Sequence, residues 1–407
     1  MTAVVHMPKT ARGTRIDARK LMEHLNAEAA NLNFWLRTEM NVPSQRAWFA
    51  DTGGATGGGE RLVRGRVAAN QHKALPCLWR WKDYGPYLER LAKIATEGDI
   101  SPIEFADRQS ILLTNPGLDG RLQITTTMRT AISVYVPGDK APAHIHSPNA
   151  SRTILTEKGG YTNVEGERCE CRRGDVIWTP NGTWHDHGND SDKPVIWIDM
   201  LDWPLMEYLD AAWVDLEYPA AAHTKSNIQK TVHGDGYSSR LYGAGGLKPD
   251  FGSHRRGWGH NPTPMIHFRG TDIREALDAL RDEEGDAYEG IVMQFVNPLT
   301  GQSVYPTMDY RAQLLRPGEE TRFKRETSSI FVIVMEGEGY SEVGGRRFDW
   351  QKNDVMVMPN FLWQRHVNTG KRDAILYTVS DAALMQNIGQ YRAQGKERDG
   401  TVTQIVA

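Results

Sequence analysis

The chain has 407 residues, a length that allows two or three domains or one fold repeated. Its 48 basic and 51 acidic residues leave a formal charge of −3, too balanced for binding nucleic acid or anionic lipid through bulk charge. The longest apolar run covers residues 330–335, whereas a membrane-spanning helix needs about 20 residues, so we expect a cytoplasmic protein with no membrane or nucleic-acid partner. Three cysteines, Cys77, Cys169 and Cys171, are too few for a disulfide framework.

The first 107 residues are expected to form an N-terminal region of helical and extended segments. Leucine and alanine recur at intervals of three and four over residues 16–40, a spacing typical of an amphipathic helix. A second helix is predicted over residues 86–96. Between them, residues 52–59 are rich in glycine but lack the signals of a phosphate-binding loop, so we interpret them as a flexible turn.

Downstream of this region the sequence changes to short β-rich runs separated by turn residues, a rhythm typical of an all-β barrel or sandwich. We expect a first β module over residues 108–219, a second over residues 291–395, and a tail over residues 396–407. Residues 220–290 lose the periodicity and are expected to form a connecting arm and one helix, which Thr271 would cap.

An internal repeat links the two β-rich regions. Sliding residues 160–189 forward by 179 positions onto residues 339–368 gives 12 identities in 30 positions. Unrelated segments of this length would share about two identities, so the match indicates one supersecondary unit present twice. The sequence therefore predicts two copies of one β-module.

Histidines alternate along two segments of the first copy. If residues 137–146, PGDKAPAHIH, form a strand, His144 and His146 project from the same face, because strand side chains alternate with period two. Residues 174–187 read as a strand, a Pro-Asn-Gly turn and a second strand that offers His185 and His187. Such a hairpin, folded against the first strand, could supply a third imidazole.

Three neutral imidazoles suit iron, copper, nickel, manganese or zinc and leave coordination positions open. In the second copy, Lys324, Glu326 and Gln364 align with His144, His146 and His185, whereas the framework residues Gly, Asp, Pro and Trp persist. The loss of all three histidines from one copy favours a metal site in the first module over a packing role. His187 has a counterpart in the second copy, His366, so both readings of His187 stay open at this point.

Two arginines precede or follow the histidine strand. Arg152 lies six positions after His146, an even offset that keeps it on the same face if the strand resumes, and its counterpart in the second copy is apolar. Arg108 precedes an apolar strand, and for this residue alone a surface salt bridge is the better default interpretation. A guanidinium near a metal is a good bidentate partner for a carboxylate.

Taken together, these segments resemble gentisate 1,2-dioxygenases and the related salicylate and 1-hydroxy-2-naphthoate dioxygenases, which are ring-cleaving bicupins. The resemblance covers about residues 79–391. It rests on PGDKAPAHIH (137–146), GERCECRRGDVIWTPNGTWHDHG (166–188), VIWIDMLDWPL (195–205) and FVNPLTGQSVYPTMDYRAQLLRPGE (295–319). It implies a mainly β fold of two cupin modules, each a double-stranded β-helix or jelly roll, with flanking N-terminal and inter-module helices.

The resemblance also implies residue roles and an activity. The implied residues are His144, His146 and His185 for one Fe(II) per subunit, Arg108 and Arg152 for the substrate carboxylate, and His187 for the ring hydroxyl. With O2 as co-substrate, a small aromatic acid such as gentisate or a 5-substituted salicylate would be opened between the carbon that bears the carboxylate and its hydroxylated neighbour. The family further implies a homotetramer.

Departures from the family pattern concern the expected pocket wall and the metal ligands. Where many members have Trp, Gly and Gln before the metal strand, this chain has Arg129, Ala131 and Ser133, so the particular acid stays open. Arg129 could meet a polar ring substituent or face solvent. The usual cupin glutamate is missing, because its expected positions hold Ala150 and Ser151.

Two competing interpretations use the same fold. A metal-dependent bicupin of another activity, such as a decarboxylase or an isomerase, would typically add a carboxylate ligand, which the missing glutamate disfavours. A non-catalytic binding cupin would purify without stoichiometric iron, so metal analysis distinguishes it.

Overall fold

The computed structural model describes residues 61–62, 65–66, 74–97, 109–222, 227–243 and 263–406. The strands β1 (Arg61–Leu62) and β2 (Gly65–Arg66) form an antiparallel pair within a separate unit, Met1–Gln71. The predicted helix over residues 16–40 and the glycine-rich residues 52–59 lie outside the described residues. All other described elements belong to the unit His72–Ala407. Among the described helices, none is both long and apolar enough to cross a membrane.

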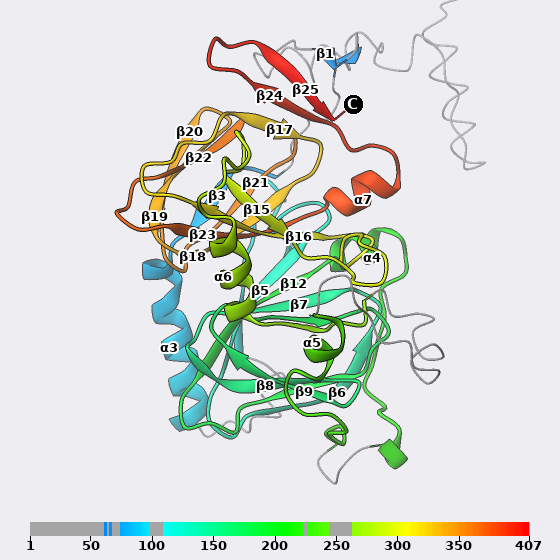
Figure 1. Cartoon of the computed structure of the whole chain (residues 1–407). Helices are drawn as coiled ribbons and strands as arrows, with labels where there is room; N and C mark the ends of the chain where they lie inside the picture. The colour runs from blue at the N-terminus through cyan, green and yellow to red at the C-terminus, as the bar shows by residue number, and fades with distance from the viewer. Residues whose placement is uncertain are drawn as a thin grey trace, which may run out of the picture. The chain divides into compact units, whose positions relative to one another are not determined.

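The first module consists of two antiparallel sheets that face each other, as Figure 1 shows in its lower half. The strand order is β14-β10-β7-β12-β5-β4 in one sheet and β13-β6-β11-β8-β9 in the other. The bounds are β4 (Gln109–Leu112), β5 (Arg129–Tyr135), β6 (Lys140–His146), β7 (Ala150–Ile154), β8 (Lys158–Val164), β9 (Glu167–Arg172), β10 (Val176–Thr179), β11 (His185–Gly188), β12 (Val195–Leu201), β13 (Val214–Asp215) and β14 (His267–Phe268).

The second module repeats this design. Its sheets have the orders β15-β16-β23-β18-β21-β3 and β20-β19-β22-β17-β24-β25, so the predicted mainly β fold of two modules is confirmed. The bounds are β3 (Cys77–Trp79), β15 (Ile291–Gln294), β16 (Asp309–Leu315), β17 (Lys324–Glu326), β18 (Ile330–Glu336), β19 (Glu338–Val343), β20 (Arg346–Gln351), β21 (Val355–Met358), β22 (Gln364–Asn368), β23 (Ala374–Ser380), β24 (Ala393–Lys396) and β25 (Val402–Val406). The helices are α3 (Trp81–Glu97), α4 (Trp203–Tyr208), the 3-10 turn η2 (Ala220–Ala222), α5 (Tyr237–Tyr242), α6 (Gly270–Ala279) and α7 (Ala382–Asn387).

The two modules exchange strands. β3 precedes the first module in the chain but pairs with β21 of the second, and β14 precedes the second module but pairs with β10 of the first. The two contacts occupy corresponding positions of the repeat, because Val355 pairs with Trp79 and Val176 pairs with Phe268. Part of the expected connecting arm therefore completes a sheet of the first module.

The helices that follow the exchanged strands begin where a distant aspartate accepts a backbone hydrogen bond. The Trp81 N–H donates to Asp354 Oδ1 at 2.7 Å, and the Gly270 N–H donates to Asp175 Oδ1 at 2.8 Å. The predicted helix starting at residue 86 therefore begins earlier, and the prediction that Thr271 caps the next helix is wrong. The first N–H groups of a helix have no partner within the helix, and an aspartate distant in the sequence can accept a hydrogen bond from one of them. A prediction based on the residues next to the helix does not find such a partner.

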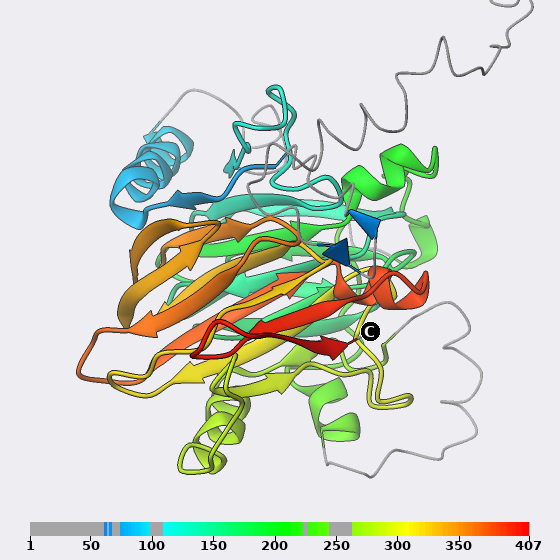
Figure 2. The same cartoon turned by 90° about the horizontal axis from the view of Figure 1, so that it is seen from above.

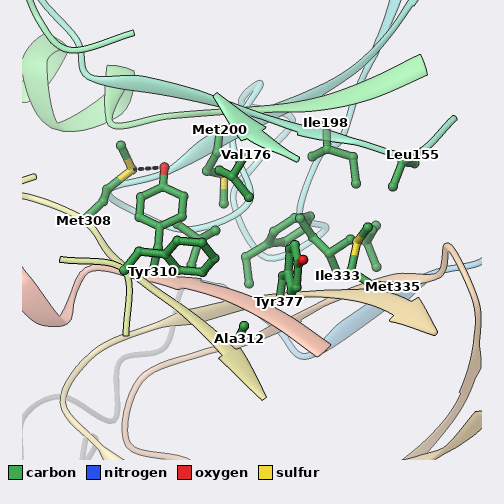
Figure 3. Close-up of a cluster of buried hydrophobic side chains, with 14 of the residues drawn as sticks. Leu155, Val176, Ile198, Met200, Met308, Tyr310, Ala312, Ile333, Met335 and Tyr377 are labelled. Atoms are coloured by element: carbon green, nitrogen blue, oxygen red, sulfur yellow. Dashed lines mark hydrogen bonds between the residues drawn. The ribbon is translucent and has the colours of Figure 1, made fainter. Parts of the chain in front are cut away.

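A continuous apolar core joins the modules. It contains Ile198 and Met200 of the first module and Tyr310, Ile333 and Tyr377 of the second. Figure 3 shows these side chains pointing toward one another between the facing strands. Seen from above in Figure 2, the yellow-to-orange strands of the second module lie over the cyan-to-green strands of the first. Each module also has a smaller apolar cluster between its own two sheets. The described residues therefore form three apolar layers, one inside each module and one between the modules.

Candidate metal centre and active site

Three imidazoles converge inside the first module. His144 and His146 lie two residues apart on β6 and so share one face of that strand. His185, on the neighbouring β11, lies opposite His144 in the strand register. The ring centroid of His185 lies 4.2 Å from that of His144 and 4.6 Å from that of His146. The predicted hairpin is wrong, because β10 pairs in one sheet and β11 in the other. The Pro-Asn-Gly turn therefore carries the chain across the sandwich.

Backbone carbonyls fix the orientation of these three rings. Pro142 O lies 2.9 Å from His144 Nδ1, Pro148 O lies 2.8 Å from His146 Nδ1, and Thr183 O lies 2.9 Å from His185 Nδ1. A carbonyl oxygen only accepts, so each Nδ1 carries the proton and each Nε2 keeps a lone pair. This is the arrangement by which a protein orients imidazole ligands toward a metal.

Burial favours the neutral form of the central ring. His185 is fully buried, and desolvation, reinforced by His144, His146 and Arg152, lowers its pKa well below the ordinary value. The Nε2 atom of His185 has no hydrogen-bond partner among the described residues. A buried acceptor without a donor is costly, and a metal ion would satisfy it. The donor set therefore fits a divalent transition metal.

A fourth histidine faces the same space with a different partner. His187 is buried, and its Nδ1 lies 3.1 Å from the Thr162 hydroxyl. The possible ligand atoms of His144, His185 and His187 all lie within 4.8 Å of one another. A hydroxyl both donates and accepts, so Thr162 does not fix the tautomer of His187 as a carbonyl would. Either ring nitrogen of His187 can therefore carry the proton of the neutral imidazole.

Arg152 lies on β7, in the sheet opposite the histidines, and its side chain is 1% exposed. Its Nε lies 3.3 Å from Asp199 Oδ1, and its Nη1 donates to Thr179 Oγ1 at 3.0 Å. The other oxygen of Asp199 accepts hydrogen bonds from Ser133 Oγ at 2.6 Å and Trp197 Nε1 at 3.2 Å. A buried ion pair with this many hydrogen bonds fixes the guanidinium in place.

Asp199 is a residue that the sequence analysis missed. The signal for it is one acidic residue within the apolar strand VIWIDML. Its counterpart in the second module is Thr378, which lies opposite Val332, the counterpart of Arg152. The ion pair is therefore confined to the module with the histidines.

The remaining predicted site residues have different placements. Arg108 lies outside the described residues. Arg129 donates to Leu122 O at 2.8 Å, lies 3.6 Å from Glu207 and stacks on Trp203, so it is held at the surface end of β5. Ala131 lies opposite Asp199 in the strand register, beside Arg152.

The second module fills the corresponding space with charges. Lys324 lies opposite Gln364, as His144 lies opposite His185, and its ammonium lies 3.0 Å from the Glu326 carboxylate. Glu289 also pairs with Lys324, and both partners raise the pKa of that lysine against the effect of burial. The cavity between them measures about 20 Å³, room for one water molecule. Paired charges thus replace the histidine triad.

His366, the counterpart of His187, predicts a pH dependence of folding. Burial lowers the pKa of His366 to about 4, from an ordinary value of 6.5. Below pH 6.5 this histidine binds a proton in the unfolded chain but stays neutral in the folded chain. The free energy of unfolding therefore falls as the pH drops toward 4, by about 3 kcal/mol. We expect His366→Gln to flatten the pH dependence of urea unfolding across this interval, measured with metal chelated. Equal slopes for the variant and the parent would contradict this prediction.

Comparisons with known proteins find similarity to cupin domains and to ring-cleaving dioxygenases. The cupin domain family matches residues 131–201 and 312–380. The chain is 35% identical to a 5-aminosalicylate 1,2-dioxygenase of Comamonas sp, over 80% of this chain and 83% of that protein. It is 33% identical to gentisate 1,2 dioxygenase 1 of Aquipseudomonas alcaligenes, over 78% of this chain and 86% of that one.

Solved structures with a similar fold include a salicylate 1,2-dioxygenase from Pseudaminobacter salicylatoxidans, with a TM-score of 0.69 and 30% identity over 80% of this chain and 89% of that chain. A structure of the same enzyme with gentisate gives a TM-score of 0.73 and 26% identity, covering 97% of each chain.

Proposed function

Because the chain belongs to the family of gentisate 1,2-dioxygenases and related ring-cleaving dioxygenases, we propose that it uses O2 to open gentisate or a related 5-substituted salicylate. The proposed cleavage lies between the carbon that bears the carboxylate and the adjacent hydroxylated carbon. The observation that carries the proposal is the set of three buried rings whose Nδ1 atoms all face backbone carbonyls.

We assign the metal to His144, His146 and His185, and we propose Fe(II), one per subunit. Their neutral imidazoles leave the full charge of the ion to attract an anionic, chelating substrate. When bound, Fe(II) supplies an electron path between the aromatic ring and O2. His187 stays outside this set by the family resemblance. Its Nδ1 faces the Thr162 hydroxyl, whereas the Nδ1 atoms of the three assigned ligands face backbone carbonyls.

Arg152 is proposed to bind the substrate carboxylate. Its partner Asp199 contacts Nε and Thr179 contacts Nη1, which holds the guanidinium in one orientation before the substrate arrives. Arg108 is proposed for the same carboxylate, by the family resemblance. His187 is proposed to accept the proton of the substrate's ring hydroxyl at its Nε2 atom.

Ala131 and Ser133 are proposed to line the ring-binding space, and Arg129 is proposed to stand at its outer end, where Leu122 O and Glu207 hold the guanidinium. Ser133 leaves more room than the glutamine common at its position in the family, whereas Ala131 adds a methyl group where the family commonly has glycine. The named relatives act on gentisate and 5-aminosalicylate, and both acids carry an electron-donating group para to the hydroxyl. Such a group makes the ring easier to oxidise, which supports the same class of substrate here.

The experiment is metal analysis followed by oxygen-electrode assays of the Fe(II)-loaded enzyme. The substrates are gentisate, salicylate, 5-amino-, 5-nitro- and 5-halosalicylates and 1-hydroxy-2-naphthoate. We expect stoichiometric iron and one O2 consumed per ring opened, with gentisate or 5-aminosalicylate fastest. Protein that binds no metal would point to a non-catalytic cupin, and metal binding without O2 uptake would point to another bicupin activity. Light scattering and cell fractionation would test the proposed homotetramer and cytoplasmic location.

A further inference from the structure

Residues 147–151 join the proposed metal ligand His146 to the proposed carboxylate-binding Arg152. Three hydroxyl groups of the second module contact this segment. We propose that the second module positions the metal centre and the arginine of the first module through these hydroxyls, with Thr307, Tyr305 and Tyr310 as positioning residues. This inference rests on the proposed function.

Thr307 acts through Asp202 and Asn149. Its hydroxyl donates to Asp202 Oδ2, and the same carboxylate accepts hydrogen bonds from the Asn149 side chain at 3.0 Å and the Asn149 N–H at 2.8 Å. Asn149 Nδ2 also lies 3.2 Å from Thr307 Oγ1. The peptide bond that joins Pro148 to Asn149 carries the carbonyl that orients His146. By holding Asn149, the second module therefore also holds the group that orients this proposed ligand.

Asn149 also connects the two metal-bearing strands. Its Oδ1 accepts a hydrogen bond at 3.1 Å from the N–H of Asn181, in the turn that leads to His185. The next residue of that turn, Gly182, donates to His146 O at 3.0 Å. A shift of Asn149 would therefore move His146 and His185 relative to each other.

Two tyrosines hold the other end of the segment. The Tyr305 hydroxyl donates to Ala150 O at 2.5 Å, and the Tyr310 hydroxyl lies 2.9 Å from Ser151 Oγ. Both tyrosines are buried, and Ser151 directly precedes Arg152. Ala150 and Ser151 also stand where a cupin usually carries its metal-binding glutamate. In this chain the same positions receive contacts from the second module.

The repeat supplies a matched control. In the second module, Ser329 replaces Asn149, and its N–H donates to Asp381 Oδ1 at 2.7 Å. Thr127 of the first module donates to Asp381 Oδ2 at 2.7 Å, as Thr307 of the second module donates to Asp202. The two hydrogen bonds are the same in kind and cross the same interface in opposite directions. Only the contact of Thr307 leads to a histidine triad.

The test compares Thr307→Val with Thr127→Val in the full-length protein. We expect Thr307→Val to weaken Co²⁺ binding about tenfold, measured by anaerobic titration, and to change the visible spectrum of the bound ion, because loss of an outer hydrogen-bond partner perturbs metal ligands. Thr127→Val should lower the thermal stability about as much as Thr307→Val does, while its Co²⁺ affinity stays equal to that of the parent. Thr307→Ser, which keeps the hydroxyl, should restore the parent affinity. Equal affinities for the two valine variants would overturn the proposal for Thr307.

Tyr310→Phe tests the other end of the segment and stays informative if Thr307→Val does not fold. We expect it to raise the KM for gentisate severalfold while Co²⁺ affinity and kcat change little, because the lost hydroxyl contacts the neighbour of Arg152. An unchanged KM would overturn this part. A parent protein that binds no metal or cleaves no ring would instead refute the proposed function, so the two failures are distinguishable.

Discussion

Replacing His185 by alanine is expected to abolish both metal binding and O2 uptake. Its ring lies nearest to both other proposed ligands, and two imidazoles on one strand do not hold an open divalent site on their own. The measurement is iron content after anaerobic loading, together with oxygen-electrode rates on gentisate. An iron-free variant that still consumes oxygen with the acid would refute the metal assignment.

The second module provides the control for this experiment. Gln364 occupies the position of His185 in the repeat and is buried to a similar degree, so Gln364→Ala removes a side chain of similar size from an equivalent strand. We expect this variant to keep its iron and its activity. Loss of iron in both variants would indicate general destabilisation instead of ligand removal.

Replacing Arg152 by methionine is expected to raise the KM for gentisate by about 10- to 100-fold, the value of a hydrogen-bonded charge pair with a carboxylate. The same change leaves Asp199 buried without its cation. An uncompensated buried charge of this kind costs about 3 to 5 kcal/mol, so the urea midpoint should fall as well. Steady-state kinetics and urea unfolding measure the two effects separately.

The double variant Arg152→Met with Asp199→Asn separates binding from stability. It removes both charges, so we expect most of the lost stability to return, because a neutral amide can still accept from Ser133. The KM should remain high, because no guanidinium is present. A double variant with the parent KM would remove Arg152 from the proposed substrate site.

We could predict from the chain alone the repeat, the two β modules and the alternation that brings His144 and His146 to one face. These features are local or periodic: strand side chains alternate with period two, and a duplicated segment retains its framework residues. The same reasoning predicted that His185 would join them, and the structure brings the three rings together. That the first copy alone binds a metal stays a prediction.

The distant groups that complete each element are visible only in the folded chain. The helix at Trp81 begins where Asp354 accepts its N–H, and Arg152 is held by Asp199 across a strand pair. The turn before His185 crosses between sheets, and Thr307 reaches Asp202 from the other module. The partners of Trp81, Arg152 and Thr307 lie tens to hundreds of residues away. A local pattern can mark one member of such a pair, as the acidic residue in an apolar strand marks Asp199, but it does not identify the other member.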